Sequence, residues 1–120
     1  MDQKYVMKTY SLNCRGKLLD LTEPVVMGIL NTTPDSFFDG GRFTGLDAAL
    51  LKAEKMLRQG AVLLDVGGAS SRSGAEVVPE DEEKQRVLPL IEAIVRRFPE
   101  AFVSVDTWRV SVAREAVAAG

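Results

Sequence analysis

The sequence predicts an α/β fold built on a parallel sheet. Three apolar runs, at residues 25–30, 62–66 and 102–105, have the length of buried strands, and each ends at or near a polar residue. Amphipathic stretches separate them, which gives a strand-and-helix repeat of roughly 40 residues. Strands and helices that alternate in this way form parallel sheets with right-handed crossovers. An open doubly wound sheet and a (β/α)8 barrel both fit, and both bind ligands at the carboxyl ends of their strands.

The residues before the first run, 6–21, have the pattern of a β-hairpin. Two short segments flank a turn at residues 13–16, where Gly16 supplies a residue that tolerates positive φ. We expect this hairpin to cover one end of the sheet rather than to bind a ligand.

The first run and the helix after it follow from local patterns. Val25 to Leu30 is continuous rather than alternating, which predicts a strand buried on both faces. Thr44 and Asp47 have the spacing of a capping box, and Gly60 is the expected end of the helix that they begin. The face of this helix that packs on the sheet is predicted to be Leu46, Ala49, Leu50, Ala53, Met56 and Leu57.

A second helix is expected between Pro79 and Phe98, and a third from residues 107–109 onward. Four acids, residues 80–83, stand in the first turn of the second helix, where the helix dipole favours them; we prefer that explanation to a cation site. Pro89 is expected to kink or split this helix. The predicted buried faces are Val87, Leu88, Leu90, Ile91, Ile94 and Val95 in the second helix, and Val110, Ala113, Ala116 and Val117 in the third.

Composition excludes several classes of protein. The chain has 120 residues, 46% of them apolar and 27% charged, which is typical of one globular domain. The net charge of −2 and the lack of a basic run argue against nucleic acid and anionic membranes as partners. No secretory signal and no membrane span are expected. A single cysteine, Cys14, suits a reducing cytoplasm. The absence of His excludes a histidine base from this chain.

Polar residues at the ends of the runs are the candidate site. The amide oxygen of Asn31 suits Mg²⁺, although an Asx turn is the alternative. The carboxylate of Asp106 can accept two hydrogen bonds from an amino-pyrimidine edge, although a helix N-cap is the alternative. Residues 67–74 combine hydroxyls, glycines and Arg72, which suits a phosphate group or, alternatively, a solvated linker. Asp65 lies inside its strand and is expected to point into the interior, where it needs a partner.

Three segments resemble the dihydropteroate synthase family. Residues 28–41, Gly-Ile-Leu-Asn-Thr-Thr-Pro-Asp-Ser-Phe-Phe-Asp-Gly-Gly, are similar to its first loop, residues 65–74 to its second loop, and residues 103–107 to its third strand end. The resemblance begins near Tyr10 and implies the barrel. Residues 1–22 would be a hairpin cap, and residues 25–120 the first three β/α units of one barrel domain. Because such a barrel needs about 250 residues, we expect the 120-residue chain alone to be inactive.

The resemblance also implies a reaction and its residues. The family condenses 6-hydroxymethyl-7,8-dihydropterin diphosphate with p-aminobenzoate, with Mg²⁺ as cofactor, to give 7,8-dihydropteroate and diphosphate. Asn31 would contact the metal. The implied catalytic residues are Asp35, Ser36 and Arg72; the pterin diphosphate would bind Ser71, Asp106 and Asn31; and Phe37 and Ser73 would line the p-aminobenzoate pocket.

The same resemblance implies a cytoplasmic homodimer that sulfonamides inhibit. Where this sequence has Ala69, Ser71 and Ser73, the family usually has Glu, Thr and Pro. Two alternatives stay open: a pterin-binding methyltransferase domain, whose first loop lacks the Thr-Pro-Asp-Ser-Phe pattern, and a non-enzymatic α/β module that binds Mg²⁺. A receiver-like module would carry a pair of acids directly after its first strand, where this chain has Asn31.

Overall fold

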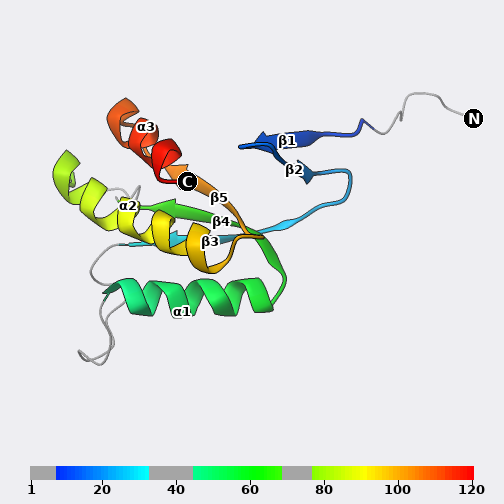
Figure 1. The fold of residues 1–120 in the computed structure, drawn as a ribbon, viewed down its shortest axis with the longest axis horizontal. Coiled ribbons are helices and arrows are strands. Elements are labelled where there is room, and N and C mark those ends of the chain that lie inside the picture. The colour runs from blue at the N-terminus through cyan, green and yellow to red at the C-terminus, as the bar shows by residue number, and fades with distance from the viewer. Residues whose placement is uncertain (1–7, 33–44, 69–76) are drawn as a thin grey trace, which may run out of the picture.

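The computed structural model describes residues 8–32, 45–68 and 77–120. Strands β3, β4 and β5 form one parallel sheet in that order, and the hairpin β1–β2 forms a separate antiparallel sheet (Figure 1). The predicted α/β class is therefore confirmed. The elements are β1 (Ser11–Cys14), β2 (Lys17–Asp20), β3 (Val26–Asn31), α1 (Gly45–Arg58), β4 (Ala61–Gly67), α2 (Glu80–Arg97), β5 (Phe102–Asp106) and α3 (Val110–Ala119).

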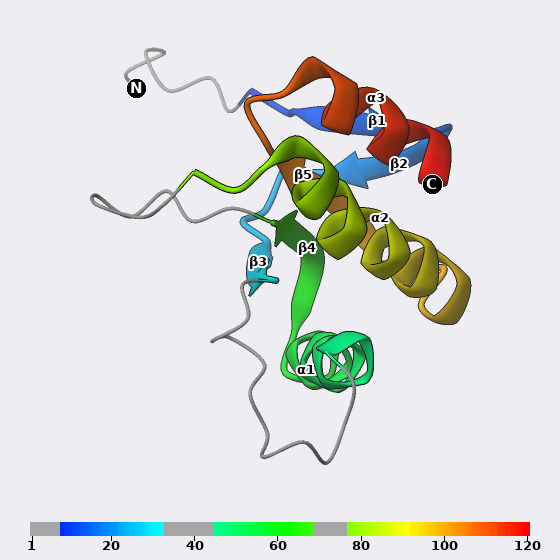
Figure 2. The ribbon, with the colours of Figure 1, turned by 90° about the vertical axis from the view of Figure 1, so that its left-hand side faces the viewer.

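The helices lie on one side of the parallel sheet (Figure 2). Alternate strand residues face them: Leu30, Leu64 and Val66 have no exposed surface and pack with the buried faces of α1 and α2. The other face has no helix over it in the described part of the chain. Met27 and Ile29 are 47% and 44% exposed there. The prediction that Val25 to Leu30 is buried on both faces is therefore wrong for this structure, because one layer of helices can cover only one side of a sheet.

The hairpin covers the amino-terminal end of β5, as the sequence predicts. Its turn has positive φ at Arg15 (55°) and Gly16 (83°). Lys17 Nζ donates to the backbone carbonyls of Pro99 and Ala101, at 2.9 Å each, and lies 4.3 Å from the centre of the Phe102 ring. The hairpin is shorter than predicted, since β1 begins at Ser11.

Helices α1 and α2 occur where the sequence predicts them. In α1, Ala49, Leu50 and Ala53 are buried, but Leu46 is 39% exposed and does not belong to the packed face. Helix α2 runs unbroken through Pro89, so the prediction of a split is wrong. Pro89 leaves the carbonyl of Gln85 without its helical donor. Both residues are exposed, so water can reach that carbonyl.

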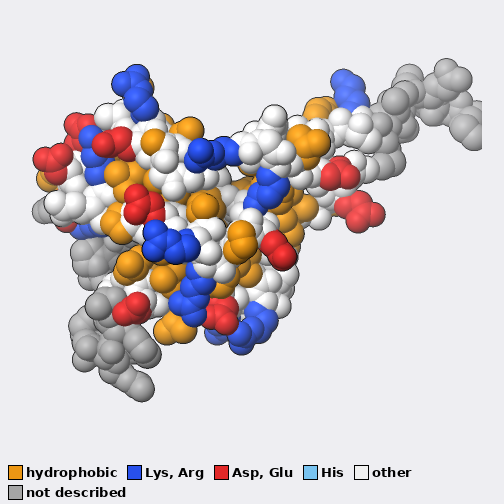
Figure 3. Space-filling model, in the orientation of Figure 1, with side chains coloured by type: hydrophobic (Ala, Val, Ile, Leu, Met, Phe, Trp, Pro, Cys, Tyr) orange, Lys and Arg blue, Asp and Glu red, His pale blue; other side chains and the backbone are white. Residues whose placement is uncertain are grey.

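Helix α3 packs on α2 with a face that agrees with the predicted one at Ala116 but not at Val110 or Val117. Val112 and Ala116 are buried, whereas Val110 and Val117 are 72% and 66% exposed. The helix is apolar on more than one side, so residue spacing alone does not select the packed face. Over the face seen in Figure 3, charges of both signs are interspersed with apolar side chains. Within the described ranges, no helix has both the length and the apolarity to cross a membrane.

Candidate active site at the strand ends

The carboxyl ends of the three parallel strands lie side by side. The register pairs Asn31 with Gly67 and Gly67 with Asp106, so the last residues of β3, β4 and β5 form one row. Paired residues of a parallel sheet place their side chains on the same face, and for this row it is the face without helices. The structure thus brings together Asn31 and Asp106, which the sequence predicted as site residues 75 positions apart in the chain.

Gly67 separates the two predicted side chains and adds none of its own. A Cβ atom built on Gly67 would lie 3.6 Å from Asn31 Oδ1 and 3.8 Å from Asp106 Cβ. Asn31 and Asp106 are themselves exposed. An amide oxygen and a carboxylate therefore flank a backbone position that a ligand can approach closely. The sequence analysis included Gly67 in a candidate phosphate-binding segment, and the strand register adds that it lies between Asn31 and Asp106.

Thr32, the first residue after β3, forms two hydrogen bonds with the end of β4. The backbone N–H of Thr32 donates to the Gly67 carbonyl at 2.8 Å, and the Thr32 hydroxyl donates to the same oxygen at 2.9 Å. These bonds hold the backbone next to Asn31 against the end of β4. The sequence analysis missed this contribution of Thr32.

Asp65 lies one row below, on the same face. It is paired in register with Ser104 of β5, and the Ser104 hydroxyl donates to Asp65 Oδ1 at 2.6 Å. Asp65 thus lies on the face opposite the helices, and the partner that the sequence analysis expected it to need is Ser104 of the neighbouring strand.

Asp106 is not a helix cap. Helix α3 begins at Val110 after Arg109, and no side chain of the described residues caps it. The turn between them is closed instead by the hydroxyl of Thr107, which accepts from the Arg109 backbone N–H at 3.2 Å. The alternative explanation for Asp106 is therefore removed, and its carboxylate is available to a ligand at the strand end.

Six predicted site residues lie outside the described ranges. The structure consequently leaves their positions untested. They are Asp35, Ser36 and Phe37 in the segment after β3, and Ser71, Arg72 and Ser73 in the segment after β4.

The side-chain donors of Asn31 and Asp106 are oxygen atoms, the type of ligand that Mg²⁺ binds. Mg²⁺ takes oxygen ligands, keeps several waters, and often binds a protein through one or two groups plus the phosphates of a substrate. Asn31 offers such an oxygen. Residues 8–32, 45–68 and 77–120 contain no cluster of three or more His, Cys, Asp or Glu side chains that could hold a metal ion. A metal bound to Asn31 would therefore need further ligands, such as water or substrate phosphate.

Two arginine side chains, one on α2 and one directly before α3, bond the two described ends of the segment that follows β4. Arg86 Nη1 donates to the Gly68 carbonyl at 3.1 Å, and Arg109 Nη2 donates to the Val78 carbonyl at 2.7 Å. Arg109 also forms an ion pair of 2.7 Å with Glu83, whose side chain has no exposed surface. These contacts explain why Glu83 is buried among the four acids at the start of α2, which the sequence analysis attributed to the helix dipole alone.

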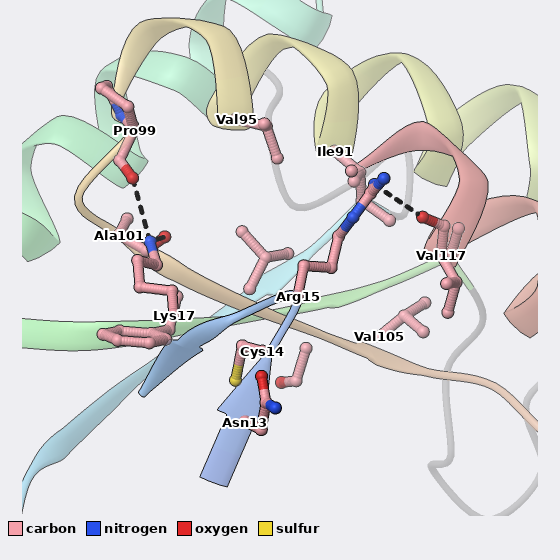
Figure 4. Close-up of a pocket in the computed structure, with 15 residues that line it drawn as sticks. Asn13, Cys14, Arg15, Lys17, Ile91, Val95, Pro99, Ala101, Val105 and Val117 are labelled. Carbon is pink, nitrogen blue, oxygen red and sulfur yellow. Dashed lines mark hydrogen bonds between the residues drawn. The ribbon is translucent and has the colours of Figure 1, made fainter. Parts of the chain in front are cut away.

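A groove of about 360 Å³ lies elsewhere, along the free edge of β5 between the hairpin, α2 and α3 (Figure 4). Its lining is largely apolar. The two cations that reach it from the hairpin are both occupied: Lys17 is bonded to the carbonyls of Pro99 and Ala101, and Arg15 Nη1 donates to the Val117 carbonyl at 3.0 Å. The groove contains neither Asn31 nor Asp106, and its chemistry is that of a packing surface.

Comparison with known proteins gives a consistent result. The family described as pterin binding enzyme matches residues 27–120. The dihydropteroate synthase of Haemophilus influenzae is 50% identical over 114 residues, which are 95% of this chain and 40% of that protein. The Bacillus subtilis dihydropteroate synthase is 49% identical over 121 aligned positions, covering 100% of this chain and 42% of that protein. The chain thus spans about 40% of the length of these relatives.

Solved structures agree. The dihydropteroate synthase of Xanthomonas albilineans with 4-aminobenzoic acid superimposes with a TM-score of 0.89 at 48% identity, over 94% of this chain and 41% of that one. The Yersinia pestis enzyme in a sulfonamide drug complex gives a TM-score of 0.82 at 51% identity, over 92% of this chain and 40% of that one. The likeness confirms the predicted fold class, a hairpin followed by the first three β/α units of a barrel of the (β/α)8 type.

Proposed function

Since residues 27–120 match the pterin-binding enzymes, the chain belongs to that family, and we propose that it forms the pterin-diphosphate-binding part of a dihydropteroate synthase. The observation that carries the proposal is the row formed by Asn31, Gly67 and Asp106 at the strand ends. Two relatives of about 50% identity are dihydropteroate synthases, and a solved structure of that enzyme contains 7,8-dihydropteroate. The proposed reaction joins 6-hydroxymethyl-7,8-dihydropterin diphosphate to p-aminobenzoate and releases diphosphate.

Asp106 is the proposed pterin ligand. An ionised carboxylate only accepts hydrogen bonds, and its two oxygens match the two N–H donors of a 2-amino-pyrimidinone edge in one plane. Gly67, next to it in the row, leaves the room that a flat ring needs to approach the sheet. Orientation of the ring by Asp106 fixes the position of the methylene carbon at which the reaction occurs.

The diphosphate belongs on the Asn31 side of the row. We propose that Asn31 contacts Mg²⁺ and that Ser71 and Arg72 donate to the diphosphate oxygens. Bound Mg²⁺ supplies neutralisation of the charge on the leaving group. Asp35 and Ser36 are proposed to complete this end of the site. Their roles rest on the resemblance of their segments to the family.

The reaction needs little covalent chemistry from the protein. The bond between the methylene carbon and the diphosphate oxygen breaks, and the diphosphate keeps the electron pair. The amine nitrogen of p-aminobenzoate then bonds to the carbon and loses a proton. Stabilisation of the leaving charge and exclusion of water are therefore the main requirements. We propose that Phe37 and Ser73 help to hold the p-aminobenzoate.

The finer properties follow from the same assignment. We propose that the enzyme works as a cytoplasmic homodimer and that sulfonamides compete with p-aminobenzoate for its site. The Yersinia pestis enzyme in complex with a sulfonamide drug supports the second statement. The single cysteine supports the first in part, because it suits a reducing compartment.

The test is calorimetric titration of the chain with a pterin diphosphate analogue and Mg²⁺, with circular dichroism on the same sample. Asp106→Ala should weaken binding by roughly 100-fold, because two charge-assisted hydrogen bonds of about 1.5 kcal/mol or more each are lost. Asp81→Ala removes an exposed acid from α2 and should have no effect. Equal binding by the Asp106 variant and the control would contradict the assignment of the pterin ligand.

The same titration separates the alternatives. Binding of the pterin that does not depend on the diphosphate would favour the methyltransferase domain. Cooperative melting without any binding would favour a non-enzymatic module. Absence of binding together with non-cooperative melting would show that these 120 residues do not complete the site by themselves.

A further inference from the structure

Strand β4 carries one charged residue, Asp65, two positions before its last residue, Gly67. Asp65 lies on the face of the sheet without helices, directly below the row of Asn31, Gly67 and Asp106. Residues two apart in a strand are separated by about 6.6 Å, so a flat ring that lies over Gly67 and extends toward the interior reaches the level of Asp65. The carboxylate of Asp65 therefore borders the space that the proposed ligand occupies.

The protein uses one oxygen of the Asp65 carboxylate. The Ser104 hydroxyl donates to Oδ1 at 2.6 Å, whereas Oδ2 accepts no hydrogen bond from a group in residues 8–32, 45–68 and 77–120. No Lys or Arg of these ranges forms an ion pair with Asp65 or Asp106. Ser104 lies two residues before Asp106 on β5, so its bond draws the Asp65 carboxylate toward the strand that carries the proposed pterin ligand. The second oxygen is thereby left for a donor that a ligand supplies.

A link between the two strands does not by itself explain the charge. Asp is depleted in strands, and the rest of β4 is apolar or glycine. A neutral pair of hydroxyl side chains, such as Thr with Ser, also forms cross-strand hydrogen bonds. Such a pair would join β4 to β5 without placing a carboxylate below the ligand. The charge indicates a partner with N–H groups, since an ionised carboxylate only accepts hydrogen bonds.

We propose that Asp65 is a second carboxylate contact of the ring, which accepts a hydrogen bond from the 2-amino group of the pterin, and that Ser104 is its positioning residue. The inference rests on the proposed function, in which Asp106 takes one N–H of that amino group together with the neighbouring ring N–H. The second N–H of the amino group is then the donor for Asp65.

The spacing of the two carboxylates suits an amino group between them. A nitrogen that donates to two oxygens, each about 2.9 Å away, holds those oxygens about 5 Å apart. Asp65 and Asp106 are one strand and two residues apart in register, so their backbones are separated by about 8 Å. Side chains that lean toward each other on the same face can bring one oxygen of each to the shorter distance. Discrimination for a ring with a free 2-amino group follows from this arrangement.

The test uses two ligands that differ by one methyl group: the pterin diphosphate analogue, and the same analogue methylated on its 2-amino nitrogen. The two hydrogen bonds to Asp106 leave only the side of Asp65 for that methyl group. Both ligands are titrated calorimetrically, with Mg²⁺, into the wild-type chain, Asp65→Thr, Asp65→Ala and the control Ile29→Ala. Ile29 is paired with Asp65 in register and is 44% exposed, so the control shortens a side chain of the same row without removing an acceptor. Thermal unfolding of each variant is followed by circular dichroism.

We expect the wild-type chain to prefer the unmethylated ligand by roughly 30-fold, because methylation removes one hydrogen bond to a charged group. Asp65→Thr keeps a hydroxyl for Ser104 and should melt near the wild-type temperature, yet its preference should fall below about threefold. Asp65→Ala should lose the preference in the same way, and it guards against a failure of the first variant to fold. Ile29→Ala should keep the wild-type preference, whatever its effect on affinity.

The part of Ser104 is tested by comparison of Ser104→Ala with Ser104→Thr, which keeps the hydroxyl. Without the hydroxyl, Asp65 is no longer held in the binding orientation, and the preference should fall by roughly threefold or more; Ser104→Thr should retain it. Equal preferences in these two variants would overturn the positioning role. An unchanged preference in both Asp65 variants, while Asp106→Ala still weakens binding, would overturn the inference and leave the proposed function intact. Absence of binding by the wild-type chain would overturn both.

Discussion

Substitution of Gly67 by Ala is expected to lower ligand affinity without lowering the stability of the folded protein. The added methyl group would lie between Asn31 and Asp106, 3.6 Å from Asn31 Oδ1 and 3.8 Å from Asp106 Cβ. Both distances are ordinary van der Waals contacts, so the protein has room for the methyl group. Gly67 is not among the glycines with positive φ in the described part of the chain, so Ala can adopt its backbone conformation without strain.

The expected effects on stability and binding have opposite signs. Ala in place of Gly within a strand stabilises by about 0.5–1 kcal/mol, mainly because the unfolded chain loses conformational freedom. For a domain of this size the unfolding midpoint should rise by roughly 2–6 °C. A ligand that lies over Gly67 meets the methyl group and loses at least one hydrogen bond to a charged group. That loss costs about 1.5–3 kcal/mol, or roughly 10- to 100-fold in affinity.

The assay is calorimetric titration with the pterin diphosphate analogue, together with thermal unfolding of the same sample. Gly45→Ala is the matched control, because a Cβ atom there has no neighbour within 4 Å among the described residues, and Gly45 begins α1, away from the row. The control should raise the unfolding midpoint and leave affinity unchanged. A Gly67→Ala variant that binds as tightly as wild type would refute the reasoning, since the ligand could not then occupy the space between Asn31 and Asp106.

Three further predictions concern the fold. The Ser111 hydroxyl, and after it Lys84, lowers the pKa of the exposed Glu80 carboxyl below its usual 4.5. Its stabilising effect is therefore present above that value and lost as the pH falls through the folded-state pKa, and Glu80→Gln should flatten the decline of the unfolding midpoint below about pH 5. Leu64→Ala, at a position with no exposed surface, should cost about 2–5 kcal/mol in urea unfolding. Lys17→Met removes two hydrogen bonds of 2.9 Å to backbone carbonyls and should lower the free energy of unfolding by about 1–3 kcal/mol. Ligand affinity should not change, because the hairpin lies away from the row of Asn31, Gly67 and Asp106; weaker binding in a titration would contradict this.

The strands were predictable because their signal is local. Each is a continuous apolar run that ends at a polar residue, and parallel strands bring such ends together whatever their distance in the sequence. Asn31 and Asp106 could be placed in one site for that reason. Burial was harder to predict, because it depends on what covers each face. The sequence predicts that residues 25–30 are buried on both faces of the sheet, yet helices cover only one side of β3 in the described structure.

The missed residues had weaker signals. Glu83 lies four positions before Val87, at the amino end of the buried stripe of α2, so helical spacing marks it as an acid on an apolar face. Its position within a run of four acids concealed this. Arg109 had no local signal, because its partners Glu83 and Val78 are 26 and 31 residues away. The packed face of α3 was also beyond local reasoning, since that helix is apolar on several sides.

The last residue of β4, Gly67, and the residue after it, Gly68, face opposite sides of the sheet and contact different parts of the protein. Gly67 belongs to the row with Asn31 and Asp106, whereas Gly68 meets α2. At Gly68 a methyl group would lie 2.7 Å from Val87 Cγ2 and 3.2 Å from the Glu83 carbonyl oxygen, so the helix or the strand end has to move. Gly68→Ala should therefore cost about 1–3 kcal/mol, where Gly67→Ala stabilises. Measured together by urea unfolding, the pair distinguishes a glycine required by helix packing from one required by the ligand, and equal effects on stability would show that the two positions are not distinct.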